Sequence, residues 1–343
     1  MIAAAERPMI VIGHGARDAM PAIIALAEAL QLPVATTFKS KGLIPDDHPC
    51  AAGVLGRSGT PIASWFMNEC DLILTLGSSF SNHTGIASYK PIIQVNFERM
   101  QLGKFHPVSL PIWGEIGQFA QAVMQRLPAS RRGGDQRPEI AERWQIWRAE
   151  KASRVADQSG AGIGSALIFE ALTKHCPADA IIACDVGNNT YSFGRYFEPK
   201  GQRVLMSGYL GSIGFSLPAA IGAWAATQDF PEYAGRKIVS ISGDCGFGQY
   251  AMEFTTAVKH YMDITHILLN NGQLGKITKE QRAGDFAVWE TGLHNPSFAA
   301  FAKLCGGHGQ KVTKADQLEE ALSTALAHKG PALVEIMSDP DQI

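Results

Sequence analysis

The sequence predicts an α/β protein with two doubly wound, mostly parallel sheets flanked by helices. Short runs rich in Val, Ile and Leu alternate with stretches of helical periodicity, the pattern of strands that helices bury on both faces. The alternation occurs in two halves, separated by a segment rich in Pro, Gly and charge. With 343 residues, 46% of them hydrophobic, the chain is long enough for two domains with packed cores.

The first half, residues 1–130, shows this alternation throughout. The opening MIAAAERP has the composition of a helix's last turn and a half, ended by Pro8. A helix that short has nothing to nucleate on, so we expect the chain to begin in the middle of an element. The expected strands are 9–13, 33–38, 71–77 and 91–97, and the expected helices are about 18–30 and 115–127.

A change of composition predicts a linker and connecting helix at residues 131–155. PASRRGGDQRPE, at 128–139, is poor in apolar residues, and the aromatic-bearing ERWQIWRAEKASR follows it. The second domain, residues 156–343, then repeats the alternation. Its expected strands are 180–185, 203–207, 237–242, 264–270 and 332–337, and its expected helices are 163–175, 215–226, 249–261 and 315–328.

Charge and cysteine usage exclude several classes of function. Thirty basic and thirty-two acidic residues leave no long single-sign run, so neither nucleic acid nor a membrane surface is the expected partner. The six cysteines show no zinc-ligand spacing, which is typical of thiols in a reducing compartment. No segment reaches the roughly 18 apolar residues of a membrane span, and no secretion signal precedes the first strand. We therefore expect a cytoplasmic protein with a small-molecule ligand.

Four consecutive strand ends of the second half carry loops that combine glycine with polar side chains. In an open parallel sheet, ligands bind beyond the carboxyl ends of the strands. Asp244 follows one strand directly and Asn271 follows the next, 27 positions on, which is the spacing of one β-α-β unit. Their oxygens are ligands that Mg²⁺ accepts, with phosphate and water completing the octahedron. The four loops are CDVGNN (184–189), SGYLGSIG (207–214), SGDCGFG (242–248) and NNGQLG (270–275).

The glycines at 243, 246 and 248 predict a phosphate cradle beside these oxygens. They let backbone N–H groups approach phosphate oxygens, and the helix expected from about Gln249 points its positive end the same way. A lone Gly-Asp is usually only a turn, but the Asn-Asn pair at β-α-β distance favours a site. The sequence therefore predicts Mg²⁺ bound with a diphosphate.

The residues that carry this pattern also resemble a known family. GDCGFGQYAMEFTTAVKHYMDITHILLNN (243–271) is similar to the thiamin diphosphate signature, which runs from G-D-G to N-N. SGYLGSIGFSLPAAIGA (207–223) resembles the segment before it in the acetolactate synthase, pyruvate oxidase and pyruvate decarboxylase superfamily. IGHGARDA, TFKSKGLIPDDHP and AGVLG in the first half are similar to the central domain of those enzymes.

The resemblance implies roles for individual residues. Asp244 and the Asn271 side chain would bind Mg²⁺, with the main-chain carbonyl of Gln273 as the third protein ligand. Two positions would have catalytic roles. Gly211 would accept a hydrogen bond from the aminopyrimidine, and Ile213 would wedge the cofactor into the bent shape that brings this ring near the thiazolium C2 proton. The implied diphosphate contacts are Gly187, Asn188, Asn189, Gly243, Cys245 and Gly246.

The resemblance further implies a thiamin diphosphate- and Mg²⁺-dependent conversion of a 2-oxo acid, by decarboxylation with carboligation or by oxidation. The family's first domain, which grips the pyrimidine and supplies a catalytic glutamate, has no counterpart in these residues. We therefore expect a partner chain that carries it, within a homo- or hetero-oligomer. The alternative is a non-catalytic, regulatory cofactor-binding module or a truncated fragment.

Three features keep two interpretations each. Cys245 replaces the usual third glycine of the signature, either as a small filler, which we favour, or as a thiol activated at a helix N-terminus. Glu280 is either an exposed helix charge, which we favour, or a residue that faces the substrate. G-H-G at 13–15 favours a tight turn over a dinucleotide fingerprint.

Asn96 stands where flavin-binding relatives often have an acidic residue, with Glu98 two positions on, which leaves FAD compatible but unsupported.

Overall fold

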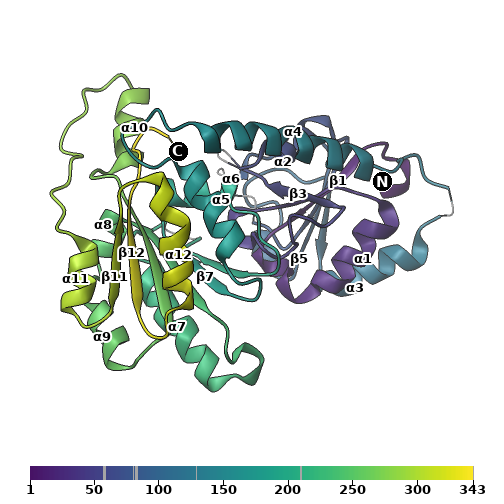
Figure 1. Cartoon of the computed structure of the whole chain (residues 1–343). Helices are drawn as coiled ribbons and strands as arrows, with labels where there is room; N and C mark the ends of the chain where they lie inside the picture. Colours follow the sequence, from purple (N-terminus) through teal and green to yellow (C-terminus); the bar gives the residue numbers. More distant parts are fainter. Residues whose placement is uncertain (57–58, 80, 82–83, 129, 209–210, 343) are drawn as a thin grey trace. The chain divides into compact units, whose positions relative to one another are not determined.

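The computed structural model describes residues 1–56, 59–79, 81, 84–128, 130–208 and 211–342. The chain divides into two compact units, Met1–Glu150 and Lys151–Ile343 (Figure 1). Each unit contains one six-stranded sheet, and every pairing between the named strands is parallel. This confirms the predicted α/β class with parallel sheets flanked by helices.

The sheet of the first unit has the strand order β3-β2-β1-β4-β5-β6. The four central strands are buried along their whole length, as expected for the nearly continuous Val, Ile and Leu runs. The strands are β1 Pro8–Ile12, β2 Val34–Thr36, β3 Ala51–Val54, β4 Leu72–Leu76, β5 Ile92–Asn96 and β6 Leu110–Trp113.

Helices cover both faces of this sheet. α1 and α3 contact each other and pack their apolar sides onto β1, β4 and β5. On α2 and α4, Trp65 Nε1 donates to Glu139 Oε1 at 2.8 Å, and Trp144 Nε1 donates to the Ala51 carbonyl at the β3 edge. The helices are α1 Met20–Leu30, α2 Pro61–Glu69, α3 Ile116–Arg126 and α4 Arg137–Ala156, with the 3₁₀ turns η1 Ile2–Ala4, η2 His14–Ala19, η3 Phe38–Ser40 and η5 Arg99–Gln101.

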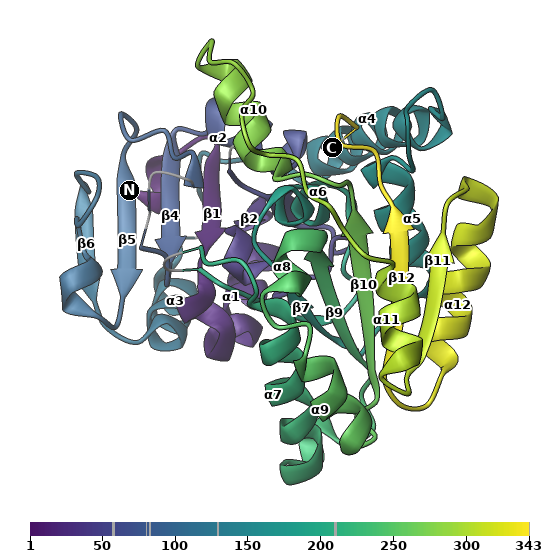
Figure 2. The same cartoon turned by 90° about the vertical axis from the view of Figure 1, so that its left-hand side faces the viewer.

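The sheet of the second unit has the order β11-β12-β10-β9-β7-β8, and Figure 2 shows β7, β9, β10 and β12 side by side. From β7 the chain crosses outward to β8, then returns to β9 on the other side of β7 and continues to β10. The strand order therefore reverses between β7 and β9, which is where a doubly wound sheet opens a crevice for a ligand. The strands are β7 Ile181–Cys184, β8 Arg203–Met206, β9 Ile238–Gly243, β10 Ile264–Asn270, β11 His308–Val312 and β12 Ala332–Met337.

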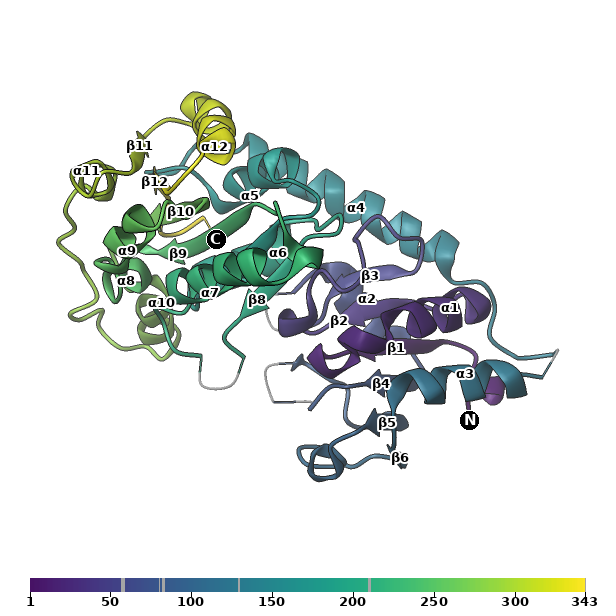
Figure 3. The same cartoon turned by 90° about the horizontal axis from the view of Figure 1, so that it is seen from below.

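The helices of the second unit lie on both faces of its sheet (Figure 3). On one face α5 contacts both α6 and α12, and α7, α9 and α11 cover the other face. The helices are α5 Ser165–His175, α6 Asn188–Tyr196, α7 Ser216–Asp229, α8 Asp244–Gly248, α9 Glu253–Lys259, α10 Gly275–Ala283, α11 Phe298–Leu304 and α12 Leu318–Ala327, with η6 Pro231–Tyr233 and η7 Ala315–Gln317.

One predicted helix is wrong in a way that matters for the site. Instead of a single helix at 249–261, the chain forms the five-residue α8 and then, after a series of tight turns, α9. Gly246 and Gly248 weaken helix propagation. The turns carry bonds of the 3₁₀ type, Tyr250 N to the Phe247 carbonyl and Glu253 N to the Tyr250 carbonyl. Helical structure thus begins at Asp244 itself.

At the start of the chain, where the last turns of a helix were expected, the structure has the short 3₁₀ turn η1.

Candidate functional site

The predicted loops of the second unit follow adjacent strands at the point where the strand order reverses. Cys184 at the end of β7 is in register with Ile241 of β9, and Gly243 of β9 is in register with Leu269 of β10. Asp185, Asp244 and Asn271 therefore follow the ends of three neighbouring strands. The structure brings these loops together at one edge of the sheet, as the β-α-β spacing predicts.

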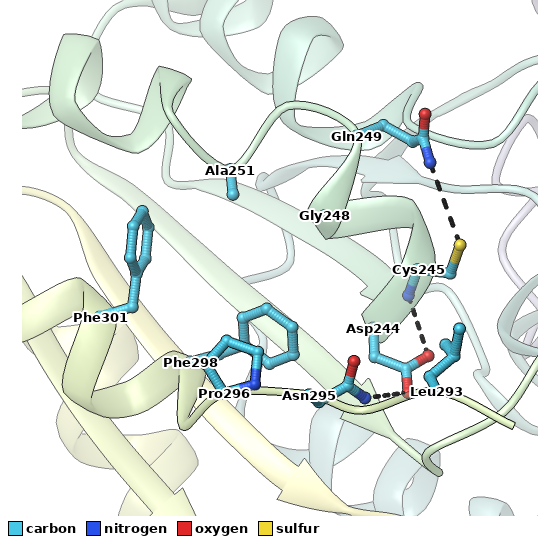
Figure 4. Close-up of a pocket in the computed structure, with 10 residues that line it drawn as sticks. All are labelled: Asp244, Cys245, Gly248, Gln249, Ala251, Leu293, Asn295, Pro296, Phe298 and Phe301. Carbon is cyan, nitrogen blue, oxygen red and sulfur yellow. Dashed lines mark hydrogen bonds between the residues drawn. The ribbon is translucent and has the colours of Figure 1, made fainter.

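Asp244 is a buried carboxylate whose partners are neutral donors. Its side chain is 3% exposed. Oδ1 accepts from Cys245 N at 2.9 Å, and Oδ2 accepts from Asn295 Nδ2 at 2.7 Å (Figure 4). Oδ2 also accepts from Gly272 N at 2.9 Å. Burial raises the pKa of Asp244, and these three hydrogen bonds oppose that rise. All of these donors are neutral, so they solvate the carboxylate without compensating its charge.

Asn271 and Gln273 lie in the loop that Gly272 ties to Asp244. Asn271 Oδ1 accepts from Gln273 N at 3.2 Å, and the Gln273 carbonyl accepts from Gly275 N at 2.9 Å. Each oxygen keeps a second lone pair. Within the described residues no three His, Cys, Asp or Glu side chains group as a metal site. A cation here would be held by one carboxylate with amide and carbonyl oxygens, a donor set that suits Mg²⁺.

Gly187, Asn188 and Asn189 form the start of α6 on the β7 side. Gly187 has φ +134°, a backbone conformation that side chains rarely adopt, and no side chain caps the helix. Asn188 Nδ2 is buried without a hydrogen-bond partner among the described residues. An unpaired donor beside the free N–H groups of a helix start suits a phosphate oxygen. Asn189 faces inward instead and donates to the Asp185 carbonyl at 3.0 Å.

Two glycines show how closely the loops approach one another. A Cβ on Gly246 would lie 3.0 Å from Asp185 Oδ2, and a Cβ on Gly275 would lie 2.5 Å from Asn188 Nδ2 and 3.0 Å from Asn271 Nδ2. Asn188, the predicted phosphate donor, and Asn271, the predicted metal ligand, therefore both lie close to Gly275. At Gly243 a Cβ would meet nothing nearer than 3.9 Å, so this steric reason does not apply there.

Gly211 and Ile213 lie in the loop between β8 and α7. Ile213 is 40% exposed although it is apolar, so a covering group would gain by contacting it. Tyr209 and Leu210 of the same SGYLGSIG motif lie outside the described residues. The loop ends at Gly214, whose backbone binds Asp185.

The structure favours the small-filler interpretation of Cys245 over the activated thiol. The side chain is half-buried, and its burial and the neighbouring Asp244 both raise the pKa of the thiol. The expected helix dipole is also weak, because α8 has only five residues. These features agree with a small filling side chain, and the backbone N–H of Cys245 is bonded to Asp244.

Asn295 is the most direct neighbour of the site that sequence reasoning missed. It lies in the loop between α10 and α11, and its Nδ2 bridges Asp244 Oδ2 at 2.7 Å and Asn270 Oδ1 at 3.0 Å. Asn270 Nδ2 in turn donates to Glu335 Oε1 at 2.9 Å. The only signal in the sequence is Asn-Pro ahead of a helix, which is common in loops.

Glu335 is fully buried on β12, and its side chain holds the end of the loop that contains Asn295. Its Oε2 accepts from Ala299 N at 3.0 Å and Ser297 Oγ at 3.3 Å, and Lys311 Nζ lies 3.4 Å from Oε1. Ser297 caps α11. A charged residue inside the apolar run ALVEIM signals such a buried network, because burying a carboxylate is costly without partners.

A pocket of about 430 Å³ opens beside α8 (Figure 4). Among the predicted site residues only Asp244 and Cys245 line it, and its other walls are mostly apolar. It therefore includes Cys245 and Gly248 of the predicted diphosphate cradle, but not the residues at the start of α6. The remaining lining residues are Gly248, Gln249, Ala251, Leu293, Asn295, Pro296, Phe298 and Phe301.

His266 on β10 packs directly behind α8 and stays neutral. It is fully buried, its Nε2 lies 2.8 Å from Ser242 Oγ, and its ring centroid lies 4.6 Å from that of Phe247. Burial lowers the pKa of His266 to about 3. Since an unfolded histidine has a pKa near 6.5, the unfolded chain takes up a proton that the folded chain cannot hold.

We expect this histidine to destabilise the protein as the pH falls from about 6.5 toward 3. Between pH 7 and pH 5 its contribution amounts to a loss of up to about 2 kcal/mol in the free energy of unfolding. His266→Leu should remove that part of the loss, and replacing the exposed His260 by Gln should not. Urea unfolding at both pH values measures it, and an equal loss in His266→Leu and the wild type would contradict the assignment.

In the first unit, the glycines of G-H-G pack against a neighbouring loop. A Cβ on Gly13 would lie 2.3 Å from the Gly77 carbonyl oxygen, and Gly15 N donates to that oxygen at 3.1 Å. This favours the tight-turn interpretation. Asn96 Oδ1 accepts from Glu98 N at 2.9 Å, a local turn that adds no support for FAD.

Glu280 pairs with Lys276 at 2.9 Å on α10 and is 60% exposed, in agreement with an exposed helix charge.

Within the described residues, no helix has the length and apolarity that a membrane crossing requires.

Two family descriptions match the chain. Residues 1–123 match "Thiamine pyrophosphate enzyme, central domain", and residues 185–336 match "Thiamine pyrophosphate enzyme, C-terminal TPP binding domain". The second match covers the four strand-end loops except the first residue of CDVGNN. The matched regions fall one in each of the two structural units.

Similar curated proteins cover nearly the whole chain. It is 32% identical over 336 residues to the putative thiamine pyrophosphate-containing protein YdaP of Bacillus subtilis (strain 168), covering 97% of this chain and 57% of that protein. It is 29% identical to the acetolactate synthase isozyme 2 large subunit of Escherichia coli (strain K12), covering 99% and 61%. It is also 29% identical to a sulfoacetaldehyde acetyltransferase of Rhodobacter capsulatus, covering 95% and 60%. The chain thus spans less than two thirds of the length of these relatives.

Proposed function

Because the chain belongs to the thiamine pyrophosphate enzymes, we propose that its second unit binds Mg²⁺ and thiamin diphosphate at the edge where β7, β9 and β10 end. The reaction we propose is the conversion of a 2-oxo acid. The observation that carries the proposal is the buried Asp244 carboxylate, whose side-chain partners are neutral donors and whose pKa is raised by burial.

Asp244 supplies the negative charge of the proposed metal site, and neutral oxygens complete its protein ligands. These are Asn271 Oδ1 and the Gln273 carbonyl, in the loop that Gly272 N holds on Asp244. Burying an unpaired carboxylate is costly, and a bound cation would offset that cost. The fit therefore rests on the donor set and its charge.

The diphosphate is proposed to lie against the loops that follow β7 and β9. Asn188 would donate its orphaned Nδ2, together with backbone N–H groups at the start of α6. Cys245 N is already bonded to Asp244, so Gly246 N is the better candidate on the other side. Gly187 and Gly243 precede the two helices and leave the approach open.

The thiamin end is proposed to lie over the loop that contains Gly211 and Ile213. When bound, thiamin diphosphate supplies an electron sink for decarboxylating a 2-oxo acid. The exposed Ile213 side chain would support its rings, and the Gly211 carbonyl would accept a hydrogen bond from the pyrimidine amino group.

Carboligation of the acetolactate synthase type is the favoured outcome, because several of the similar proteins are described as established or probable acetolactate synthase large subunits. Oxidation of the pyruvate oxidase type remains the alternative. We further propose that these residues act in an oligomer with a pyrimidine-binding domain, which another polypeptide segment supplies together with the glutamate that acts on the pyrimidine.

The purified chain, given pyruvate, thiamin diphosphate and Mg²⁺, is therefore expected to bind the cofactor but to release no CO₂ above background. Coexpression with a polypeptide that carries a pyrimidine-binding domain should restore turnover, measured as CO₂ release and acetolactate. Decarboxylation by the chain alone would contradict the need for that domain. Cofactor binding without turnover in the pair would favour a regulatory binding module instead.

A further inference from the structure

We propose that Asp185 is a positioning residue that shapes the loop between β8 and α7 to receive the thiamin end of the cofactor. The proposal rests on the proposed function and assigns it a residue that touches neither metal nor diphosphate. Asp185 follows β7 directly and is 1% exposed, so its carboxylate lies beneath the strand-end loops.

The Asp185 carboxylate is saturated by donors from the neighbouring loop. Gly214 N donates to both oxygens, at 2.9 and 3.1 Å, while Ser216 N and Ser216 Oγ donate to Oδ2 at 3.2 and 3.1 Å. Val186 N adds a bond to Oδ1 at 2.7 Å. Four of these five bonds reach across 29 to 31 residues of sequence, so one side chain holds the end of the β8–α7 loop against β7.

The same carboxylate lies close to Gly246 of α8, the helix that follows β9. A Cβ on Gly246 would lie 3.0 Å from Asp185 Oδ2 and 3.2 Å from its Cγ. Asp185 thus lies between the predicted thiamin-binding loop and the predicted diphosphate loop, at the point where the strand order reverses.

The geometry of Gly214 restricts the backbone at the end of this loop. Its φ is +87°, and a Cβ there would lie 2.8 Å from the Tyr250 ring and 2.9 Å from Gln249 Cβ. Its N–H is bonded to Asp185, and Tyr250 and Gln249 leave no room for a side chain on its α-carbon. The exposed side chain of Ile213, the residue before it, therefore adjoins a backbone of restricted conformation.

The chemistry of the site requires an acceptor without protons. All described contacts of the carboxylate come from N–H or O–H donors. An asparagine would turn its NH₂ group toward a backbone N–H and lose at least one of these bonds. Asp185→Asn therefore perturbs the loop without changing the size of the side chain.

The test compares two probes, thiamin diphosphate and inorganic diphosphate. Each is titrated into the purified chain at saturating Mg²⁺. In Asp185→Asn the Kd for thiamin diphosphate should rise about tenfold or more, and the Kd for inorganic diphosphate should stay within about twofold. Without any ligand, hydrogen exchange at the Gly214 and Ser216 amides should accelerate, while exchange along β9 should not.

Two further variants keep the test informative if Asp185→Asn folds poorly. Ser216→Ala removes one donor to the carboxylate and should weaken thiamin diphosphate binding in the same direction by a smaller factor, about two- to threefold. Thr190→Val is the matched control, because the Thr190 hydroxyl donates to the main-chain carbonyl of Asp185 and not to the carboxylate. It should leave the ratio of the two Kd values unchanged.

Equal weakening of both probes, or unchanged amide exchange, would overturn the positioning role and leave Asp185 as a general stabilising residue. A wild-type chain that binds neither probe would instead contradict the proposed function. The exchange measurement would then still decide whether Asp185 holds the loop.

Discussion

Asp244→Ala is expected to weaken Mg²⁺-dependent binding of thiamin diphosphate at least about 100-fold. Residues that only support metal ligands typically change metal affinity by about 10- to 100-fold, and Asp244 is proposed to contribute the only carboxylate of the site. The loss corresponds to about 2.7 kcal/mol or more of binding free energy. Calorimetric titration at several Mg²⁺ concentrations measures it, with circular dichroism to show that the variant is folded.

Cys245→Gly is the matched control for this variant. It changes the adjacent residue but keeps the backbone N–H that bonds Asp244, so thiamin diphosphate binding should stay within about twofold of the wild type. Equal losses in the two variants would contradict the assignment of Asp244 as the metal ligand.

Asn295→Ala is expected to raise the Mg²⁺ concentration that gives half-maximal cofactor binding by about 10-fold or more. Asn295 Nδ2 holds both Asp244 Oδ2 and Asn270 Oδ1, so its loss leaves two buried oxygens with fewer donors and frees the carboxylate to rotate. Cofactor titrations in a Mg²⁺ series measure the shift. A purely structural role would lower stability and leave the Mg²⁺ dependence unchanged.

Ser297→Ala separates these two roles. Ser297 lies in the same loop, caps α11 and contacts Glu335, but none of its described contacts reaches Asp244. Loss of the cap should cost about 1 kcal/mol of stability. If Ser297→Ala shifts the Mg²⁺ requirement as far as Asn295→Ala, the bridge to Asp244 does not explain the effect.

The parts of the fold that sequence predicted best are those in which the local pattern and the buried environment agree. ITHILLN and ALVEIM are apolar runs bounded by turn residues, and they form β10 and β12 at the expected positions. The short edge strand β3 and the exposed β6 lack such a pattern, because edge positions are less buried or are covered by a distant element. Trp144 on α4 caps the β3 edge from 93 residues away.

The site could be predicted where the chemistry follows a strand in sequence and not where it comes from elsewhere. Asp244 and Asn271 follow adjacent strands, so their spacing predicts their proximity. Asn295 reaches the same carboxylate across 51 residues from an irregular loop, and no periodicity encodes that contact. Asp185 lay within a recognised motif, but its role depends on Gly214 and Ser216 in another loop.

The break between α8 and α9 has a similar cause. Residues 249–261 have a helical pattern, but the bonds of Asp244 to Cys245 and Gly272 start the helix five residues early. The glycine-rich segment then cannot continue as one helix. Tertiary contacts of a predicted functional residue thus override the local helical propensity.

The central claim is that Mg²⁺ and the diphosphate of thiamin diphosphate bind where β7, β9 and β10 end. A crystal structure of the wild-type chain with thiamin diphosphate and Mn²⁺ in place of Mg²⁺ tests it most directly, because anomalous scattering locates the metal. We predict one strong anomalous peak at roughly 2.1 Å from an Asp244 carboxylate oxygen, with the diphosphate between the metal and Asn188. Metal and diphosphate bound away from Asp244 would contradict the account.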